Sequence, residues 1–424
     1  MVFCDGCVSA LVFCLDDLSP DVREQAGWTL GNIAGDGTEF RDVVLNQNAM
    51  DGIIKNVNHP YNKSLLKNLV WALSNLCRNK PSPPLSTIEP AVLPLVNIIK
   101  GYSQKVLDCN SFDVDDKDII IDSCWALSYI TDGENAKIQK VIDCGVTSNL
   151  VELLASSSAS IVTPVLRIIG NFVSGSDTQT DEVIKCLAIP AILPLLTHEK
   201  KNIRKESCWA LSNITAGTRK QINKVFNCKS VDNPMKKIVD ISLSTNEIWD
   251  VRKEAIWCIG NVCSGGSSAN IQAVVEFGAI EAICRVLDVQ DTQIVTVAID
   301  AITKIFSVGN KAGKIDEYLR IVDEYEGIDK LEALQMSDDE NIYKKAMFII
   351  ETYMSGEEVD DENNENLMIP NVGEDGSAFN FGFPQKSFEI PSEANIVAIG
   401  GVKPTPIPLQ QTQTFNFSAD QFKF

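Results

Sequence analysis

The sequence predicts an all-α fold, a solenoid of stacked helical repeats followed by a tail of different composition. A tryptophan with an asparagine or a tyrosine four residues later recurs along the chain, each time among apolar residues at helical spacing. The pairs are Trp28 with Asn32, Trp71 with Asn75, Trp125 with Tyr129, Trp209 with Asn213 and Trp257 with Asn261, and a sixth segment has Arg167 before Asn171.

The spacing of these segments defines the repeat. Successive Trp or Arg positions are 43, 54, 42, 42 and 48 residues apart. A period of about 40–47 residues is typical of armadillo and HEAT repeats. The longer intervals predict polar insertions at residues 101–117 and 229–247.

Each unit is expected to hold a short helix, such as residues 147–155, then a turn and a long helix that carries the Trp/Asn pair. The long helices are predicted to end at glycine, because left-handed geometry costs glycine little. These glycines are Gly35, Gly133, Gly175, Gly217 and Gly265. Weaker units follow at residues 294–308 and 341–354, the first with Asp300 and Lys304 at the marked positions.

Composition narrows the class of partner. The chain has 424 residues, 45% of them hydrophobic, and a formal net charge of −20. Such acidity argues against nucleic-acid binding and favours a basic partner. Thirteen cysteines without a framework of pairs predict reduced thiols. No apolar run approaches the roughly 18 residues of a membrane span.

The Trp/Asn pairs suggest a binding surface. Positions i and i+4 share one face of a helix, so each indole lies beside an amide. The amide could bond the backbone of an extended guest, and neighbouring indoles could hold the stem and charge of lysine or arginine, for about 0.5–2 kcal/mol per contact. The alternative is that each tryptophan is simply part of the core.

Acidic residues near these pairs are further candidates. Asp122, Glu206 and Glu254 each precede a tryptophan by three residues, and Asp36, Asp132 and Asp177 follow long helices, where the macrodipole disfavours a carboxylate. Arg167 interrupts the aromatic series. We expect it to repel guest charge and to pair with Asp122 or Glu206, the alternative being a purely structural arginine.

Catalytic motifs are not evident. The two histidines, His59 and His198, flank loop-like stretches, and neither a phosphate-binding glycine loop nor a nucleophile elbow is found. Cys4 and Cys7 have the spacing of half a zinc site without a second pair. The sequence therefore predicts a protein that is not an enzyme and needs no cofactor or metal.

The repeat segments resemble those of the importin-α family, armadillo adaptors that recognise nuclear localisation signals. The resemblance runs from about residue 21 to residue 356. It is carried by GWTLGNIAGDGTEFRDVVL, WALSNLCRNK, DSCWALSYITDG, LRIIGNFVSG, KESCWALSNITAG and GVTSNLVELLA. Tyr129 in place of asparagine and Arg167 in place of tryptophan are features of that family. The resemblance implies a right-handed superhelical armadillo solenoid that shuttles between cytoplasm and nucleus.

The resemblance also implies roles for individual residues. A major site for nuclear localisation signals would use Trp28, Asn32, Asp36, Trp71, Asn75, Asp122, Trp125 and Tyr129, with Asp36 meeting the key lysine. A minor site would use Arg167, Asn171, Val173, Gly175, Thr180, Glu206, Trp209, Asn213, Glu254, Trp257 and Asn261, with Val173, Gly175 and Thr180 around its lysine.

Both ends of the chain differ from the repeats. Residues 1–20 contain no lysine or arginine and form an atypical partial repeat, residues 21–357 are the predicted armadillo repeats, and residues 358–424 are predicted to be disordered, first acidic and then rich in Phe, Pro and Gln. The basic importin-β-binding segment and first repeat of the family are not found in this sequence. Importin-β is therefore not an expected direct partner, and apolar surface should be exposed around residues 8–15.

Other partners follow from the resemblance. The acidic region after Met354 resembles the part of the family that engages an export receptor of the CAS type, and nucleoporins are further candidates. Two other functions stay open: a truncated form that sequesters cargo without delivery by importin-β, and a catenin-like armadillo scaffold. No nucleic acid or membrane partner is expected.

Overall fold

The computed structural model describes residues 6–107, 114–228 and 233–354, and within these ranges all regular structure is helical. Long helices contain the predicted repeat segments. They are α2 (Pro20–Gly35), α5 (Lys63–Cys77), α7 (Val114–Ile130), α10 (Ala159–Val173), α13 (Lys201–Thr215), α16 (Trp249–Gly265), α19 (Thr292–Lys311) and α22 (Glu340–Tyr353).

Shorter helices, and the long α6, connect them. These are α1 (Cys7–Cys14), α3 (Thr38–Asn46), α4 (Ala49–Asn58), α6 (Leu85–Leu107), α8 (Asn135–Asp143), α9 (Thr147–Leu153), α11 (Asp177–Lys185), α12 (Ala188–Ile192), the 3-10 helix η1 (Leu193–Thr197), α14 (Arg219–Phe226), α15 (Pro234–Leu243), α17 (Ser268–Glu276), α18 (Ala279–Cys284), α20 (Ile315–Glu324) and α21 (Gly327–Leu334).

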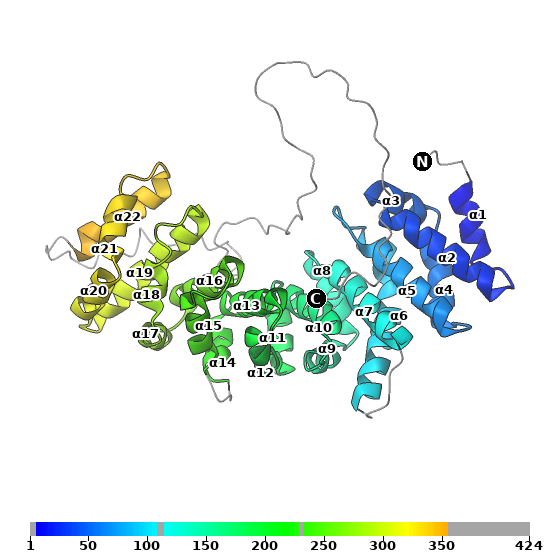
Figure 1. Ribbon diagram of the computed structural model, residues 1–424, viewed down its shortest axis with the longest axis horizontal. Helices are drawn as coiled ribbons and strands as arrows, with labels where there is room; N and C mark the ends of the chain where they lie inside the picture. The colour runs from blue at the N-terminus through cyan, green and yellow to red at the C-terminus, as the bar shows by residue number, and fades with distance from the viewer. Residues whose placement is uncertain (1–5, 108–113, 229–232, 355–424) are drawn as a thin grey trace, which may run out of the picture. The chain divides into compact units, whose positions relative to one another are not determined.

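The long helices pack in chain order. Each contacts the next one, from α2 on α5 and α5 on α7 through to α19 on α22, and Figure 1 shows the units following one another. Such a unit cannot bury its apolar face alone, so stacking creates one continuous core. The predicted all-α solenoid of helical repeats is confirmed.

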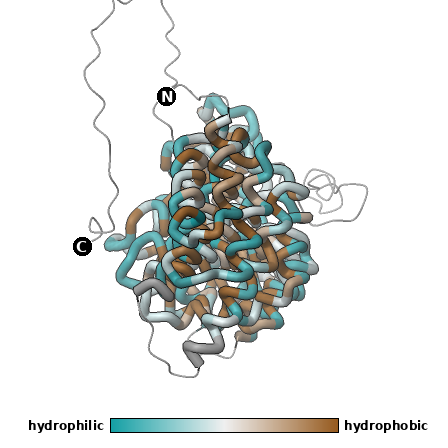
Figure 2. The backbone as a smooth tube through the Cα atoms, turned by 90° about the vertical axis from the view of Figure 1, so that its right-hand side faces the viewer, coloured by the Kyte–Doolittle hydropathy of each residue, from teal (hydrophilic) through white to brown (hydrophobic). Residues whose placement is uncertain are grey.

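The core lies between neighbouring units. Leu73, Leu127, Ile169, Leu211 and Ile259, one from each of five successive long helices, are completely buried. Figure 2 shows hydrophobic and hydrophilic stretches alternating along the stacked helices. This is the amphipathic pattern expected of helices that present one face to a core.

One helix departs from the expectation about apolar runs. By length and composition α19 could cross a membrane, but 56% of its apolar window is buried within the protein. That burial is typical of a core helix, which passes the same composition test.

The polar insertion expected at residues 101–117 as a loop is helical wherever the structure describes it, and the described part of the second insertion, at 229–247, also contains a helix. Residues 101–107 continue α6, and residues 114–117 begin α7. Within 229–247 the chain forms α15, where Pro234 occupies the first turn and Asn233 Oδ1 accepts from Met235 N–H at 2.9 Å. Proline in the first turn, after a capping asparagine, starts a helix without losing a hydrogen bond.

The predicted role of the glycines was also largely wrong. Of the five, only Gly133 has a positive φ, 122°. A Cβ on Gly175 or Gly217 would lie 2.1 Å or 2.0 Å from the Oε1 atom of Gln179 or Gln221. These glutamines complete capping boxes at the starts of α11 and α14. Glycine is needed there for close approach, and its left-handed freedom is not used.

Two buried cations hold the connection between α5 and α6. Arg41 of α3 is 1% exposed, and its guanidinium donates to the carbonyls of Arg78 at 2.7 Å and Pro81 at 2.9 Å. Lys137 of α8 is fully buried, and its Nζ donates to Ser82 Oγ at 2.7 Å. The connection is therefore fixed to the units on both sides.

The exposed apolar surface expected near residues 8–15 is present in part. Phe13 is 81% exposed and the following Leu18 is 97% exposed, whereas Val8 and Leu15 are buried. The tail predicted at 358–424 lies outside the described residues, as does the acidic region after Met354.

Candidate functional site

Two indoles of the Trp/Asn pairs, those of Trp71 and Trp209, pack onto a glycine of the preceding long helix. A Cβ on Gly31 would lie 2.7 Å from the Trp71 ring, and one on Gly170 would lie 2.2 Å from the Trp209 ring. Trp71, Trp125, Trp209 and Trp257 are half-buried. The rings therefore serve the packing between units while keeping part of their surface accessible.

The series changes at each end. Trp28 on α2 is 48% exposed. On α19 the side chain that packs on the preceding long helix is aliphatic, since a Cβ on Gly260 would lie 2.4 Å from Cγ1 of Val297, three residues before the Asp300 that the repeat places at the Trp position. The aromatic positions therefore run from α2 to α16, interrupted at α10 by Arg167.

Four asparagines form the same bridge between long helices. Each Nδ2 donates to a main-chain carbonyl three residues after the Trp or Arg position of the preceding long helix. The bonds run from Asn75 to Gly31 (3.2 Å), Asn171 to Ser128 (2.9 Å), Asn213 to Gly170 (3.5 Å) and Asn261 to Ser212 (2.8 Å). We call these residues the bridging asparagines.

This bridge gives the amides a structural role that the sequence did not indicate. Asn75 and Asn171 are buried at 5% and 4% exposure, because the preceding long helix lies over them. Asn213 and Asn261 are half-buried. Within the described residues the side chains of these last two make only the bridging bond, so Oδ1 and one N–H of each can meet a peptide backbone.

Two pairs lack a bridge. Asn32 is exposed, and its Nδ2 donates to the carbonyl of Trp28 in its own helix at 3.0 Å. Tyr129 stacks on Trp125, with ring centroids 5.8 Å apart and planes inclined by 22°. Burial raises the pKa of the Tyr129 hydroxyl above its usual value, so the ring stays neutral at physiological pH.

Arg167 lies against the following long helix. Its Nη2 is 2.6 Å from Glu206 Oε1, and its guanidinium carbon is 5.3 Å from the centroid of the Trp209 ring. Of the two acids suggested by the sequence, Glu206 is thus its partner. Glu206 Oε2 is buried and has no hydrogen-bond partner in the described part of the chain.

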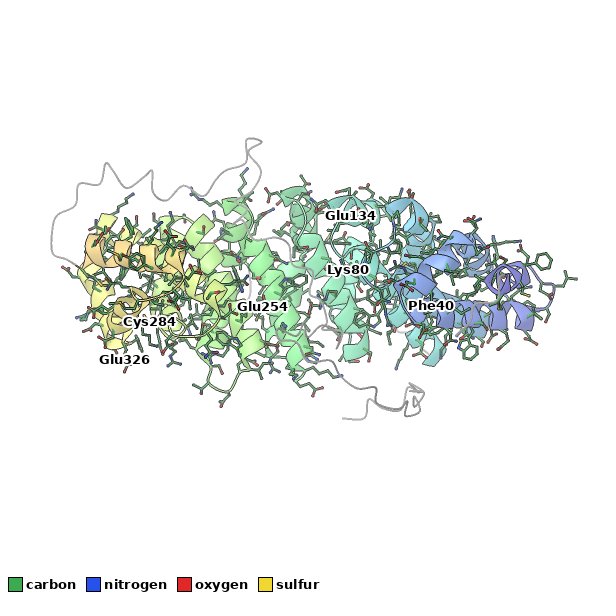
Figure 3. All side chains as sticks on the ribbon, turned by 90° about the horizontal axis from the view of Figure 1, so that it is seen from above. Phe40, Lys80, Glu134, Glu254, Cys284 and Glu326 are labelled. Atoms are coloured by element: carbon green, nitrogen blue, oxygen red, sulfur yellow. The ribbon has the colours of Figure 1, made fainter. Side chains whose placement is uncertain are left out.

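Three carboxyl groups beside the indoles share an unusual environment. Burial raises the pKa of Asp122 and of Glu254 to about 7, outweighing the attraction of Lys67 and Lys205 respectively. Burial also raises the pKa of Glu206, despite its contact with Arg167. Glu254, which is labelled on α16 in Figure 3, is only 7% exposed. Such carboxyl groups would gain from a cation that approached them.

The three carboxylates predicted at helix ends differ from one another. Asp36 is exposed at the C-terminal end of α2. Asp132 forms an ion pair with Lys80 at 3.0 Å. The expectation for Asp177 was wrong, because this residue lies in the first turn of α11, where the helix dipole favours a carboxylate.

The residues predicted around a minor-site lysine lie at the end of α10 and the start of α11. Val173 and Thr180 are both 3% exposed, and Thr180 Oγ1 donates to the Val173 carbonyl at 3.3 Å. Gly175 is half-buried beside Gln179. The hydroxyl of Thr180 is therefore engaged by the backbone at the end of α10.

Ion pairs between neighbouring long helices were missed. Lys67 pairs with Asp118 at 2.5 Å, and Lys205 lies 3.6 Å from Asp250. Each lysine is four residues before a tryptophan, and each aspartate is seven residues before the next one. This spacing could have identified them. The pairs neutralise acids that would otherwise attract a guest.

A separate cavity of about 470 Å³ lies away from the Trp/Asn pairs, and no residue of these pairs lines it. Its walls come from α4, α6 and α8. They include Ile54, Glu89, Leu93, Lys140 and Cys144.

Comparison with known proteins identifies armadillo repeats in this chain. The model of the Armadillo/beta-catenin-like repeat matches residues 5–35, 176–216 and 267–307, and that of the Atypical Arm repeat matches residues 316–370. A designed armadillo repeat protein of known structure is 26% identical to this chain, with a TM-score of 0.51. The match covers 61% of this chain and 98% of the designed protein.

Natural relatives are more similar. Importin subunit alpha-1b of Oryza sativa subsp. japonica is 41% identical over 385 residues, which is 90% of this chain and 67% of that protein. Importin subunit alpha-2 of Arabidopsis thaliana is 42% identical, over 83% of this chain and 64% of that protein. The chain thus spans about two thirds of the length of these relatives. With its stacked helical units and its series of Trp/Asn pairs, the chain belongs to the importin-α family of armadillo-repeat proteins.

Proposed function

We propose that this chain binds Lys/Arg-rich segments of other proteins along the Trp/Asn pairs, and that it acts as a nuclear import adaptor for proteins carrying such nuclear localisation signals. The observation that carries the proposal is the set of carboxyl groups beside the indoles that are buried, as Glu254 is, or half-buried, as Asp122 and Glu206 are. A guest ammonium or guanidinium would offset their burial, and the accessible ring surface would contact its aliphatic stem.

The relatives support the same function. Those compared above are named importin subunits alpha, and a computationally designed armadillo protein described as made for modular peptide recognition is 25% identical to this chain, with a TM-score of 0.51. A peptide in extended conformation advances about 3.3 Å per residue, and packed helices lie roughly 8–10 Å apart. Successive long helices would thus meet guest residues two or three positions apart.

Two sites are proposed on this surface. The major site comprises Trp28, Asn32, Asp36, Trp71, Asn75, Asp122, Trp125 and Tyr129. The minor site comprises Arg167, Asn171, Val173, Gly175, Thr180, Glu206, Trp209, Asn213, Glu254, Trp257 and Asn261. Because Asn75 and Asn171 are buried bridging residues, we assign their part in binding to positioning the indoles.

Delivery and recycling follow from the family. An export receptor of the CAS type is proposed to bind the acidic region after Met354, and nucleoporins are further candidate partners. The proposed location is the cytoplasm and the nucleus.

A titration tests the proposal. A fluorescent Lys/Arg-rich peptide is expected to bind with micromolar or better affinity, and binding should be lost at high salt because the contacts are ionic. Replacing Trp209 and Trp257 together by alanine should abolish binding at the minor site. Tyr61 is a matched control, since it is 72% exposed and distant from the Trp/Asn pairs in sequence, and Tyr61→Ala should bind normally.

The alternatives give different results. A catenin-like scaffold would favour an acidic peptide over a basic one in the same titration. A form that sequesters cargo would bind the basic peptide but would not support import in permeabilised cells unless a basic N-terminal segment were supplied. Unchanged affinity in the double tryptophan variant would contradict the site assignment.

A further inference from the structure

The cavity of about 470 Å³ runs along one face of α6. Six residues of α6 line it at helical spacing and so form a single stripe: Ser86, Glu89, Pro90, Leu93, Pro94 and Asn97. Helix α6 packs against both α4 and α8. Ile54 and Asn58 line the cavity from α4, and Lys140 lines it from α8. We call this cavity, with the stripe as its floor, the α6 groove.

Leu93, near the middle of the stripe, is 57% exposed. The surrounding sequence occurs twice in the chain, as PAVLPL at residues 90–95 and as PAILPL at residues 190–195. In the second copy the chain changes from α12 to the 3-10 helix η1 at Leu193, and that leucine is only 5% exposed. Helix α6 stays α-helical through the same sequence and leaves Leu93 open. The exposure of Leu93 therefore belongs to this helix and is not imposed by the local sequence.

Two prolines leave hydrogen-bond acceptors on the stripe. Pro90 and Pro94 lie inside α6 and have no N–H, so the carbonyls four residues earlier, those of Ser86 and Pro90, lack their helical donors. A main-chain acceptor needs a donor from water or from another molecule. Glu89 and Lys140, the two charged residues in the lining of the groove, pair with each other at 2.5 Å. The groove thus offers main-chain acceptors beside an exposed leucine, and its own charges are balanced.

We infer that the α6 groove binds an amphipathic helix of a partner protein, with an apolar residue against Leu93 and side-chain N–H groups toward the carbonyls of Ser86 and Pro90. At 1.5 Å per residue the stripe is about 16 Å long, which is about three helical turns. A helix that lies in a groove uses anchors at i, i+4 and i+7, and the stripe has the same spacing. A neutral donor such as glutamine suits these acceptors, because the charges of the groove are already paired. The inference does not depend on peptide binding along the Trp/Asn pairs.

A neutral helical peptide tests the inference. The probe is a peptide of about 15 residues, long enough to form a helix, with leucines at i, i+4 and i+7 bordered by glutamines. A scrambled peptide of the same composition is its control. Fluorescence anisotropy should give a micromolar Kd for the probe and no saturable binding for the scrambled peptide. Leu93→Lys should weaken binding about tenfold or more, because it removes the central apolar contact. Leu187→Lys is the matched variant, since Leu187 is 68% exposed and lies between α11 and α12, and it should bind normally.

A second pair of measurements tests the acceptors. Pro90→Ala restores an N–H that bonds the Ser86 carbonyl within α6, so the glutamine peptide should bind about fivefold more weakly. A peptide with methionine in place of glutamine has no side-chain donor, and beyond the loss of the proline ring, which both peptides share, its affinity should not change. The melting temperature of Pro90→Ala should not fall, because alanine favours a helix. Equal effects on the two peptides would show that the Ser86 carbonyl is not used, and the assignment of the acceptors would then be wrong.

The remaining outcomes separate this site from the Trp/Asn pairs. The variant with Trp209 and Trp257 both replaced by alanine should bind the neutral peptide as the unaltered chain does. Loss of binding in that variant, with normal binding in folded Leu93→Lys, would overturn the inference. So would equal binding of the scrambled peptide, equal weakening in Leu93→Lys and Leu187→Lys, or no binding of the probe at all. If the neutral peptide binds as expected but a Lys/Arg-rich peptide does not, the inference stands and the proposed function fails.

Discussion

Asn75 donates a hydrogen bond from its side-chain amide to the main-chain carbonyl of Gly31, 3.2 Å away on the preceding long helix. Asn171, Asn213 and Asn261 make the same bond at the equivalent place in later units. A residue type with poor helix propensity thus recurs inside helices for a reason of packing. The same residues border the surface proposed to bind peptides, so stability and recognition depend on shared positions.

Removing a buried bridging amide should destabilise the fold. Asn171→Ala loses two buried hydrogen bonds, to the Ser128 carbonyl and to Thr131 Oγ1, so we expect a loss of about 1–3 kcal/mol in the free energy of unfolding. Asn32→Ala is the control, because its amide is exposed and bonds only its own helix. Urea unfolding followed by circular dichroism measures both. Equal losses in the two variants would contradict the bridging role.

Alanine at Gly170 should displace an indole. The added Cβ would lie 2.2 Å from the Trp209 ring, so the ring must move, at a cost of about 1–3 kcal/mol. Thermal melting and the tryptophan emission spectrum report the change. Gly101→Ala is the counterpart, since a Cβ there meets nothing within 4 Å and alanine favours the helix. A normal melting temperature for Gly170→Ala would show that the indole is not held there.

Basic-peptide binding should weaken as pH falls from 8 to 6. Asp122 and Glu254 have pKa values of about 7, so acidification protonates them and removes the charge that attracts the peptide. Each engaged carboxyl should contribute about a tenfold loss over this range. Calorimetry in buffers of different ionisation enthalpy should also detect proton release on binding at pH 7. In Glu254→Gln the pH dependence should become shallower, and an unaltered profile would exclude Glu254.

The raised pKa of Glu254 also predicts how the stability of the peptide-free chain depends on pH. The folded pKa of Glu254, about 7, lies above its usual value of 4.5, so its stabilising contribution is complete below pH 4.5 and is lost as pH rises through 7. Glu254→Gln should remove this loss and be more stable than the unaltered chain at pH 8, by about 1–3 kcal/mol. Thermal melting between pH 5 and 8 measures it. A variant less stable at pH 8 would contradict the prediction.

Arg41→Met should be strongly destabilising. Its buried guanidinium satisfies the carbonyls of the connection between α5 and α6, and methionine would leave those carbonyls without donors, at a cost of about 2–4 kcal/mol. Arg285→Met is a suitable comparison, because that side chain is 38% exposed and donates to one carbonyl, of Leu243, at 3.0 Å. Denaturant unfolding distinguishes them, and a similar small loss in both would argue against the role of Arg41.

The helices could be predicted from the sequence because their apolar period is strong and their Trp/Asn pairs recur. The hydrogen-bond partners of the asparagine amides could not be predicted, because an asparagine inside a helix can bond a guest peptide or a neighbouring backbone equally well. Only the packing of α5 on α2 shows that Asn75 reaches Gly31. Gly175 was misread for a similar reason, because the glutamine that fills the space beside it belongs to the next helix.

The sequence predicted which acidic residues lie near the indoles, but not their burial or their ion pairs. The sequence places Glu206 and Glu254 three residues before an indole, but burial decides that their pKa values rise. It also contains Lys80 and Asp132, whose pairing depends on two connections 52 residues apart in the chain. The number of acidic residues near the site therefore overstates the negative charge that is available to attract a guest peptide.

The bridging asparagines bond to carbonyls of the backbone, and every residue type supplies that acceptor. The unit that carries Arg167 in place of tryptophan keeps the same bond, from Asn171 to Ser128. Replacing a contact residue can therefore alter what one position accepts while the interval between consecutive positions stays constant. A protein built this way can acquire new ligand preferences one unit at a time without losing the register in which an extended chain is read.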